Sequence, residues 1–303
     1  MDSLNDETIA DIRRRAGLDA KKITRAIQAI REWLDQQPHL PHDIDDGQLE
    51  KLFVRCKTSV ERSKETLDMY YALKTALPEI FSNRDPTQDW FKRVTNVRTF
   101  LPLPQSTEDL DRVTVAALLD PDPDKYSVED SLKLIFMCAD LRLRDDYFMS
   151  DILIIDLKNI SVQHLAKYTL PIFKKLEACI FKGFNTRVKA VHVINAPQFV
   201  DATVNIAKQI LKPKIAARIH VHRKGADSLK NSLPVKVLPS EFGGEAGKLR
   251  DLWADWVKKM EDNREWFLEQ ERYKSDETKR PGKSIDSGEL FGFQGSFRRL
   301  SLD

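Results

Sequence analysis

V-H-V-I-N-A-P (residues 191–197), I-H-V-H (219–222) and L-P-S-E-F-G-G-E-A-G (238–247) occur in this order near the end of the chain. The first segment is a short apolar run of the kind that forms a buried strand, and Pro197 suits the first turn of a helix. Apolar residues at helical spacing follow it, and 219–222 predicts a second short strand. This order of strand, helix, strand and glycine-rich stop predicts part of an α/β domain.

The alternation continues upstream of this stretch. We expect strands at 113–119, 151–156 and 190–194 and helices at 128–143, 161–182 and 197–211. The run D-I-L-I-I-D at 151–156 is typical of a strand buried on both faces. Strands separated by helices imply a mainly parallel sheet with crossover helices.

The first 85 or so residues predict helices instead. Apolar residues recur at helical spacing in the first of them, a second helix starts at Gln48, and a third spans 59–76. A charged helix is expected at 248–273, followed by an aperiodic strap. The expected domains are an N-terminal helical module (1–88), an α/β domain with its C-terminal helix (89–273) and an extended tail (274–303).

The composition excludes several classes of protein. The chain of 303 residues has 49 basic and 47 acidic residues, so no overall field favours nucleic acid. Its three cysteines form no C-x-x-C motif and predict neither a zinc site nor a disulfide scaffold, which fits the reducing cytosol. We find no run of about 18 apolar residues that would span a membrane. A cytoplasmic protein with peripheral membrane contact is therefore expected.

Two segments, 52–81 and 152–247, resemble the CRAL-TRIO lipid-transfer family, on the side of its tocopherol and retinaldehyde carriers. The tail resembles extensions on insect members. The resemblance implies a helical module, a lipid-binding domain with a mainly parallel sheet flanked by helices, and a mobile gate helix. It also implies a carrier without enzymatic activity or cofactor, which binds one isoprenoid-like ligand of the tocopherol, retinoid or carotenoid class and transfers it to membranes.

The resemblance assigns residues to a ligand pocket and to a gate that contacts the membrane. The expected pocket is lined by Leu132, Ile135, Phe136, Ala139, Ile155, Tyr168, Cys179, Ile180, Phe184 and Val191. The expected gate and membrane face consists of Val162, Ala166, Phe199, Val200, Thr203, Ile206 and Ile210. An ordinary core and an ordinary amphipathic helix are the alternatives for these sets. Enclosing about 500 Å² of apolar ligand surface would contribute roughly 12 kcal/mol before ordering costs.

One departure from the tocopherol carrier concerns the polar end of the ligand. Ile135 and Ala139 stand where that carrier has two serines, which makes the expected pocket drier. A buried ligand hydroxyl without a partner would cost about 1–3 kcal/mol. Tyr168 or Cys138 could supply a replacement partner.

Basic residues point to phosphoinositides. Arg187, Lys189, Lys214 and Arg218 fall on positions that bind phosphatidylinositol bisphosphate head groups in the tocopherol carrier, and Lys57 could join them. Two further arginines of that site are replaced by Cys56 and Glu65. We expect phosphoinositide contact to open the gate. A solvated basic surface is the alternative, and a phospholipid-exchange or membrane-trafficking module is the alternative function.

Two histidines, His220 and His222, share one face of the predicted strand 219–222. They could be metal ligands, but with no third ligand in view we interpret them as partners in structural hydrogen bonds.

Overall fold

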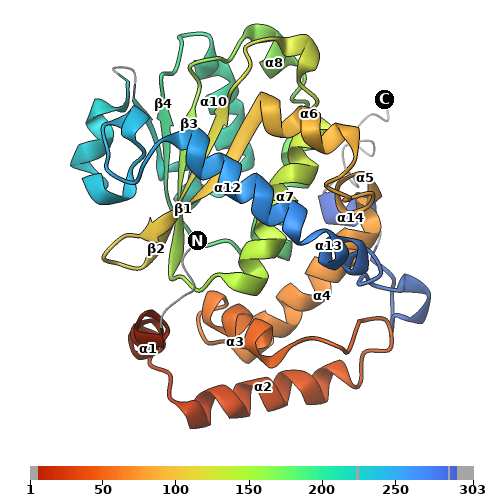
Figure 1. Ribbon diagram of the computed structural model, residues 1–303. Coiled ribbons are helices and arrows are strands. Elements are labelled where there is room, and N and C mark those ends of the chain that lie inside the picture. The colour runs from red at the N-terminus through yellow and green to blue at the C-terminus, as the bar shows by residue number, and fades with distance from the viewer. Residues whose placement is uncertain (1–5, 223–224, 286, 292–303) are drawn as a thin grey trace, which may run out of the picture.

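The computed structural model describes residues 6–222, 225–285 and 287–291. The chain begins with four helices that form a separate layer below the sheet in Figure 1: α1 (Asp6–Arg15), α2 (Ala20–Leu34), α3 (Asp46–Arg55) and α4 (Val60–Ala76). Each of the last three starts at a polar N-cap whose side chain accepts from a backbone N–H of the first turn: Asp19, Asp45 and Ser59. Such caps satisfy backbone donors that a helix leaves unpaired. The three helices expected in this region are confirmed.

The sheet has five strands in the order in which they occur in the chain. They are β1 (Arg98–Ser106), β2 (Asp111–Leu118), β3 (Ser150–Asp156), β4 (Val188–Ile194) and β5 (Ile219–His222). Strands β2 to β5 run parallel, and β1 is antiparallel to β2. The mainly parallel sheet expected from the alternation is therefore confirmed.

The sequence pattern does not predict strand β1, because Pro102 and Pro104 are typical of a turn or a junction between domains. Proline cannot donate a ladder hydrogen bond, so it is tolerated chiefly on edge strands. Strand β1 is such an edge, pairing within the described sheet with β2 alone. The carbonyl of Pro102 accepts a 2.8 Å bond from the Trp256 indole.

The connecting helices are shorter than predicted. The expected helix 161–182 is wrong as one unit: it consists of α8 (Val162–Ala166), α9 (Leu170–Glu177) and the π-helical turn η2 (Ala178–Gly183). Pro171 in the first turn of α9 explains the break, because proline suits a helix start but not its interior. The expected C-terminal helix likewise divides at Asn263 into α12 (Leu249–Asp262) and α13 (Arg264–Gln270).

The remaining elements complete the chain. Helices α5 (Pro78–Phe81) and α6 (Asp89–Val97) lead into the sheet, and α7 (Val128–Asp145) connects β2 to β3. Helices α10 (Val200–Ile210) and α11 (Pro213–Ala216) connect β4 to β5. Short 3-10 turns and a last helix are η1 (Pro123–Lys125), η3 (Ala226–Asn231), η4 (Val235–Val237), η5 (Ser240–Phe242), η6 (Glu277–Lys279) and α14 (Ser287–Phe291).

Helix α7 lies between two apolar cores. Its residues Leu134, Met137 and Leu141 pack with Ile152 and Ile154 of β3 and with α12, which crosses in front of the sheet in Figure 1. Its opposite side packs against the helical module and η2. Both cores therefore depend on α7.

Close packing requires a glycine at Gly244, the second of the two adjacent glycines in the segment 238–247. A Cβ at Gly244 would lie 2.0 Å from the backbone oxygen of Leu238. No side chain can fit there without displacing the backbone, so the chain can return onto η4 only with glycine at this position.

The segment from Ser275 onward forms a strap across the helical module. Its backbone bonds to Tyr71 and His39, and Arg280 forms a bidentate ion pair with Asp68. At its end Leu290 and Phe291 are buried in the core between the module and η2. The strap therefore ties the helical module to the sheet domain. The part of the predicted extended tail beyond residue 291 lies outside the residues that the structure describes.

A buried lysine in α4 makes stability depend on pH. Burial lowers the pKa of Lys74 to about 7, although Asp140 opposes the shift. Its unfolded pKa is about 10.4, so between pH 7 and 9 the unfolded state holds more protons and stability rises with pH. We expect the free energy of unfolding of the wild type to rise by about 2 kcal/mol more over this interval than that of Lys74→Met. The magnitude follows because one pKa unit corresponds to about 1.4 kcal/mol. Urea unfolding of both proteins at pH 7 and 9 measures this difference. An equal change in the free energy of unfolding of the two proteins would contradict the prediction.

Candidate functional site

The two faces of the sheet differ in how completely they are covered. On one face Ile152 and Ile154 are buried under α7 and α12. On the other face, the alternate residues of β3 are only partly buried, although β3 is flanked by strands on both sides. The parallel register extends this second face across β4 and β5. Val193 on this face is buried, and the remaining aliphatic residues are only partly buried: Leu153, Ile155, Val191, Ile219 and Val221.

Apolar side chains in the middle of a sheet are normally covered by a packed helix. The two crossovers α8–α9–η2 and α10–α11 run between these strands, and α10 packs beside α9 and α11. None of the residues of α9 is fully buried, and Ile172, Phe173 and Leu176 are only partly buried. Apolar surface thus remains uncovered on both the strands and the helix. We call the set Leu153, Ile155, Val191, Ile219 and Val221 the open sheet face.

The structure brings most of the predicted pocket residues together. Leu132, Phe136, Cys179 and Phe184 belong to one buried cluster, and Ile135, Ala139, Tyr168 and Ile180 pack against it. Phe136 and Phe184 stack with ring centroids 5.4 Å apart. Ile155 and Val191 lie on the open sheet face. Their role as the lining of a ligand pocket stays a prediction.

Polar groups at this cluster were only partly predicted. The hydroxyls of Tyr168 and Tyr126 are hydrogen-bonded, and Arg98 donates a 3.5 Å bond to Tyr126. Burial raises the pKa of Tyr168 well above its usual value, so this hydroxyl stays neutral. Sequence reasoning missed Arg98 because it opens the overlooked strand β1.

The predicted gate and membrane face is partly supported by exposure. Val162 is 61% exposed and Phe199 41%, and Ala166 is exposed as well. Leu119 (41%) and Leu170 (52%) add apolar surface that the sequence analysis did not single out. Val200 is buried, at 3% exposed, so its predicted role in the gate and membrane face stays a prediction. The side chains of Thr203, Ile206 and Ile210 lie outside those that the structure describes.

Three of the predicted basic residues meet where β4 and β5 begin. Arg187 precedes β4, Lys189 lies in it, and the Arg218 guanidinium donates to the carbonyl of Val188. Asn185, two residues before Arg187, donates to the backbone carbonyl of Arg55, two residues before the exposed Lys57. Lys214 is exposed on α11.

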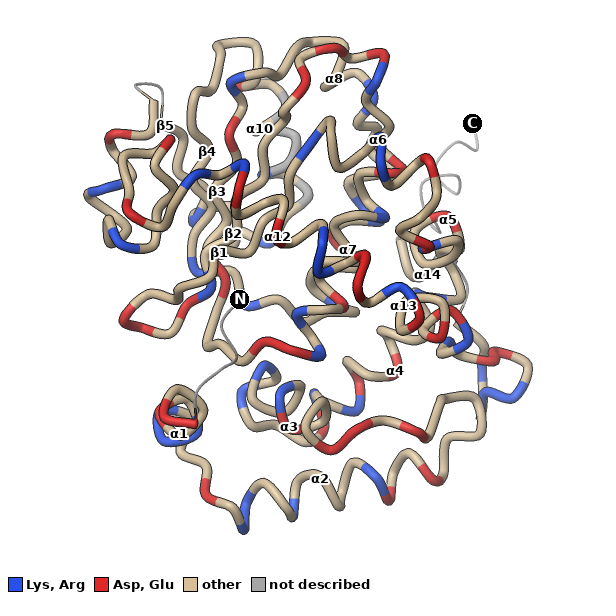
Figure 2. The backbone as a smooth tube through the Cα atoms, in the orientation of Figure 1, with Lys and Arg blue, Asp and Glu red and all other residues tan. Residues whose placement is uncertain are grey.

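Acidic residues compensate part of this basic group. Lys189 pairs with Asp109 at 2.7 Å and with Asp111 at 2.5 Å. Its ammonium is therefore already neutralised in this structure. Blue and red segments alternate over the tube in Figure 2, in agreement with the balanced composition.

A third histidine accompanies the predicted pair. His192 Nδ1 lies 2.9 Å from His222 Nε2, and His222 Nδ1 lies 2.7 Å from the Ser228 hydroxyl. Burial, followed by the neighbouring imidazoles, lowers the pKa of His192 to about 4, so it is neutral at pH 7. No group of three or more metal ligands occurs among the described residues. His222 therefore forms structural hydrogen bonds as interpreted, whereas His220 stacks on His192 with ring centroids 5.4 Å apart and forms no side-chain hydrogen bond in the described ranges.

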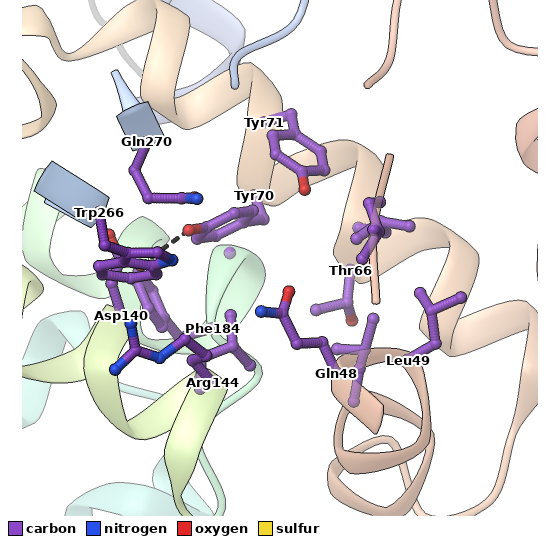
Figure 3. A pocket seen from close by; sticks show the side chains of 15 residues that line it. Gln48, Leu49, Thr66, Tyr70, Tyr71, Asp140, Arg144, Phe184, Trp266 and Gln270 are labelled. Carbon is purple, nitrogen blue, oxygen red and sulfur yellow. Dashed lines mark hydrogen bonds between the residues drawn. The ribbon is translucent and has the colours of Figure 1, made fainter. Parts of the chain in front are cut away.

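A separate hollow lies between the helical module and α7, with a volume of about 40 Å³. Figure 3 shows Gln48, Gln270 and Arg144 around it, with Tyr70 hydrogen-bonded to Asp140. A water molecule needs roughly 10–15 Å³ of such space, so this hollow holds a few waters and no lipid.

Two segments of this chain match known protein families. The family description "CRAL/TRIO domain" matches residues 100–244, which contain the sheet and its crossovers, and "Pinta-like, UBA domain" matches residues 19–91. Residues 100–244 of this chain form a CRAL/TRIO domain. The resemblance stated from residues 52–81 and 152–247 is thereby confirmed.

Curated relatives of this CRAL/TRIO protein include alpha-tocopherol transfer protein-like proteins. The mouse and human proteins are both 27% identical over 253 residues, which cover 82% of this chain and 72% of theirs. Human clavesin-2 is 22% identical over 259 residues, covering 80% of this chain and 75% of its own. The structure titled "Crystal structure of Sfh5" superposes with a TM-score of 0.51 at 14% identity over 80% of this chain and 98% of its own. That likeness shows the fold alone.

None of the helices in the described ranges is both long and apolar enough to cross a membrane.

Proposed function

We propose that this CRAL/TRIO protein is a cytoplasmic, non-enzymatic carrier that binds one hydrophobic isoprenoid-like lipid and delivers it to membranes. The open sheet face carries this proposal. Burying aliphatic surface contributes about 25 cal/mol per Å² to stability, and this contribution is missing where the surface stays in contact with water. A bound apolar molecule would recover that free energy.

The lid of this site is α10 in our proposal. It packs beside α9 and α11, and it is joined to β4 and β5 by short segments. Movement of α10 away from the sheet would therefore give a lipid access to Ile155 and Val191 without disturbing either core. The relatives named as tocopherol transfer protein-like support a ligand of the tocopherol, retinoid or carotenoid class.

Membrane contact would use the exposed apolar residues beside this lid. Val162, Leu170 and Phe199 belong to α8, the start of α9 and the turn before α10. Apolar side chains at the entrance of a lipid site can insert into the headgroup boundary, and this contact is reversible because the area is small.

The basic group would recognise phosphoinositides and favour opening. Arg187 and Lys214 make no side-chain hydrogen bond or ion pair in the described part of the chain, so their charges are available. Each basic residue near an anionic surface contributes about 1 kcal/mol.

Transfer between vesicles tests this role. Arg187→Ala/Lys214→Ala should lose about 2 kcal/mol of attraction, or roughly 30-fold in affinity for vesicles containing phosphatidylinositol bisphosphate. Transfer of a fluorescent tocopherol analogue to such vesicles should slow accordingly, while transfer to neutral vesicles should not change. Lys21→Ala/Arg25→Ala, on exposed positions of α2, is the matched control. Equal transfer by both double variants would refute phosphoinositide gating, and extraction of phospholipid alone would favour an exchange protein.

A further inference from the structure

Arg98 is a buried cation without a carboxylate partner. It is 7% exposed at the start of β1. Its Nε donates to the Thr99 carbonyl at 3.4 Å and its Nη1 to the Tyr126 hydroxyl at 3.5 Å, both near the limit for a hydrogen bond. No aspartate or glutamate in the described ranges forms an ion pair with it. Burial of an unpaired charge is costly, so buried charges are normally paired.

Arg84, Arg112 and Arg142 follow that rule, whereas the buried Arg55 donates to the carbonyl of Phe184 and forms no ion pair in the described ranges. Arg84 pairs with Asp140 at 2.5 Å, and Arg112 pairs with Asp146 at 2.8 Å. Arg98 therefore differs from these three paired arginines, and unlike Arg55 it lies beside the hydrogen-bonded hydroxyls of Tyr126 and Tyr168. An anion that is not part of the described chain would satisfy it.

The two tyrosines beside Arg98 connect it to the predicted pocket. Tyr126 belongs to the buried cluster of Leu132 and Phe136, and Tyr168 packs against the same cluster. The charge of Arg98 acts on Tyr168, where it opposes the rise in pKa that burial causes. Because Tyr168 stays neutral, neither its hydroxyl nor its ring can serve as the counter-ion.

The remaining groups around the tyrosines do not supply a negative charge either. His164 packs edge-on against Tyr126 at 5.3 Å, and its buried Nε2 has no hydrogen-bond partner within the described chain. The ammonium of Lys167 is occupied by the carbonyls of Pro123 and Tyr126. Asp120 and Asp122 raise the pKa of His164 against the effect of burial, but both pair with Lys125 and neither forms an ion pair with Arg98 in the described ranges.

We propose that Arg98, Tyr126 and Tyr168 hold the carboxylate of an amphipathic lipid, so that the preferred cargo is a long-chain or isoprenoid carboxylic acid. This inference rests on the carrier function proposed above. A guanidinium matches the two oxygens of a carboxylate, and the phenol hydroxyls can donate to the same oxygens. One cation balances the single charge of a carboxylate, whereas a phosphate monoester would bring nearly two.

Binding of a fluorescent C18 polyene carboxylic acid and of its methyl ester tests the proposal. At pH 7.4 we expect the wild-type chain to bind the acid at least tenfold more tightly than the ester. Arg98→Met should weaken acid binding at least tenfold and leave ester binding within twofold. The melting temperature of the ligand-free variant should not fall, because the substitution removes an unpaired charge. Arg93→Met, at an exposed position of α6, is the control and should keep the preference.

Tyr168→Phe provides a second test that changes no charge. It should weaken acid binding about threefold or more without affecting the ester, since only a hydrogen bond to the carboxylate is lost. Equal affinity of the wild type for acid and ester, or an unchanged preference in Tyr168→Phe and any folded Arg98→Met protein, would overturn the proposal. Binding of the ester alone would leave the carrier function standing, and binding of neither probe would refute both.

Discussion

Replacing Asp146 with asparagine should destabilise the protein by about 3–5 kcal/mol, because it removes one charge from a buried ionic network. The Asp146 carboxylate accepts two bonds from Arg112, at 2.8 and 3.0 Å, and one from Arg142 at 3.4 Å, and its side chain is fully buried. Burial alone would raise the pKa of Asp146, but the two guanidinium groups outweigh it and lower the pKa. Arg142 also pairs with Asp151 of β3 at 2.7 Å.

Asp145, the preceding residue, offers a matched control. It pairs with Arg144 and Lys259 but its side chain is 24% exposed. Asp145→Asn should therefore lower the free energy of unfolding by about 1 kcal/mol or less, because partly exposed ion pairs contribute little to stability. Urea unfolding of both variants measures the difference. Equal losses would show that the network around Asp146 contributes no more than a surface pair.

Replacing Ile155 with aspartate should weaken binding of an apolar fluorescent ligand by about 100-fold or more. The substitution places a charge on the open sheet face, and removing this charge from water beneath a bound lipid costs several kcal/mol. A loss of about 2.7 kcal/mol in binding free energy already weakens affinity 100-fold. Because Ile155 is only partly buried in the ligand-free protein, the fold should survive. Fluorescence titration together with circular dichroism measures both effects.

The adjacent residues of β3 separate binding from folding. Ile154 points to the opposite face and is 0% exposed, so Ile154→Asp should prevent folding. Ile155→Leu conserves volume and should retain binding. A folded Ile155→Asp protein that binds the ligand as tightly as the wild type would show that the lipid does not use this face.

The sequence was sufficient for the parallel strands but not for their edge. The apolar runs at 151–156 and 190–194 are distinctive because central strands have few polar residues, although one face of β3 is only partly buried and not fully buried as expected. Strand β1 carries Pro102 and Pro104, which a local pattern interprets as a turn, and only pairing with β2 explains them. Likewise, Pro171 signals the start of α9 clearly only once α8 is known to end before it.

The candidate site shows the same division. The resemblance placed Leu132, Phe136 and Phe184 in one group, and the fold brings them into one cluster. The position of Arg98 beside Tyr126 and Tyr168 depends on the register of β1 against β2, which no sequence periodicity contains. The pairing of Lys189 with Asp109, in the loop between β1 and β2, and with Asp111, the first residue of β2, likewise arises from other strands.

Native mass spectrometry of the full chain purified from its own cells, followed by organic extraction, tests the central claim most directly. The account predicts one lipid per chain, released by extraction, with a carboxylic acid as its polar group if the inference on Arg98 also holds. A chain that carries no lipid and takes up none when offered apolar ligands would contradict the carrier function.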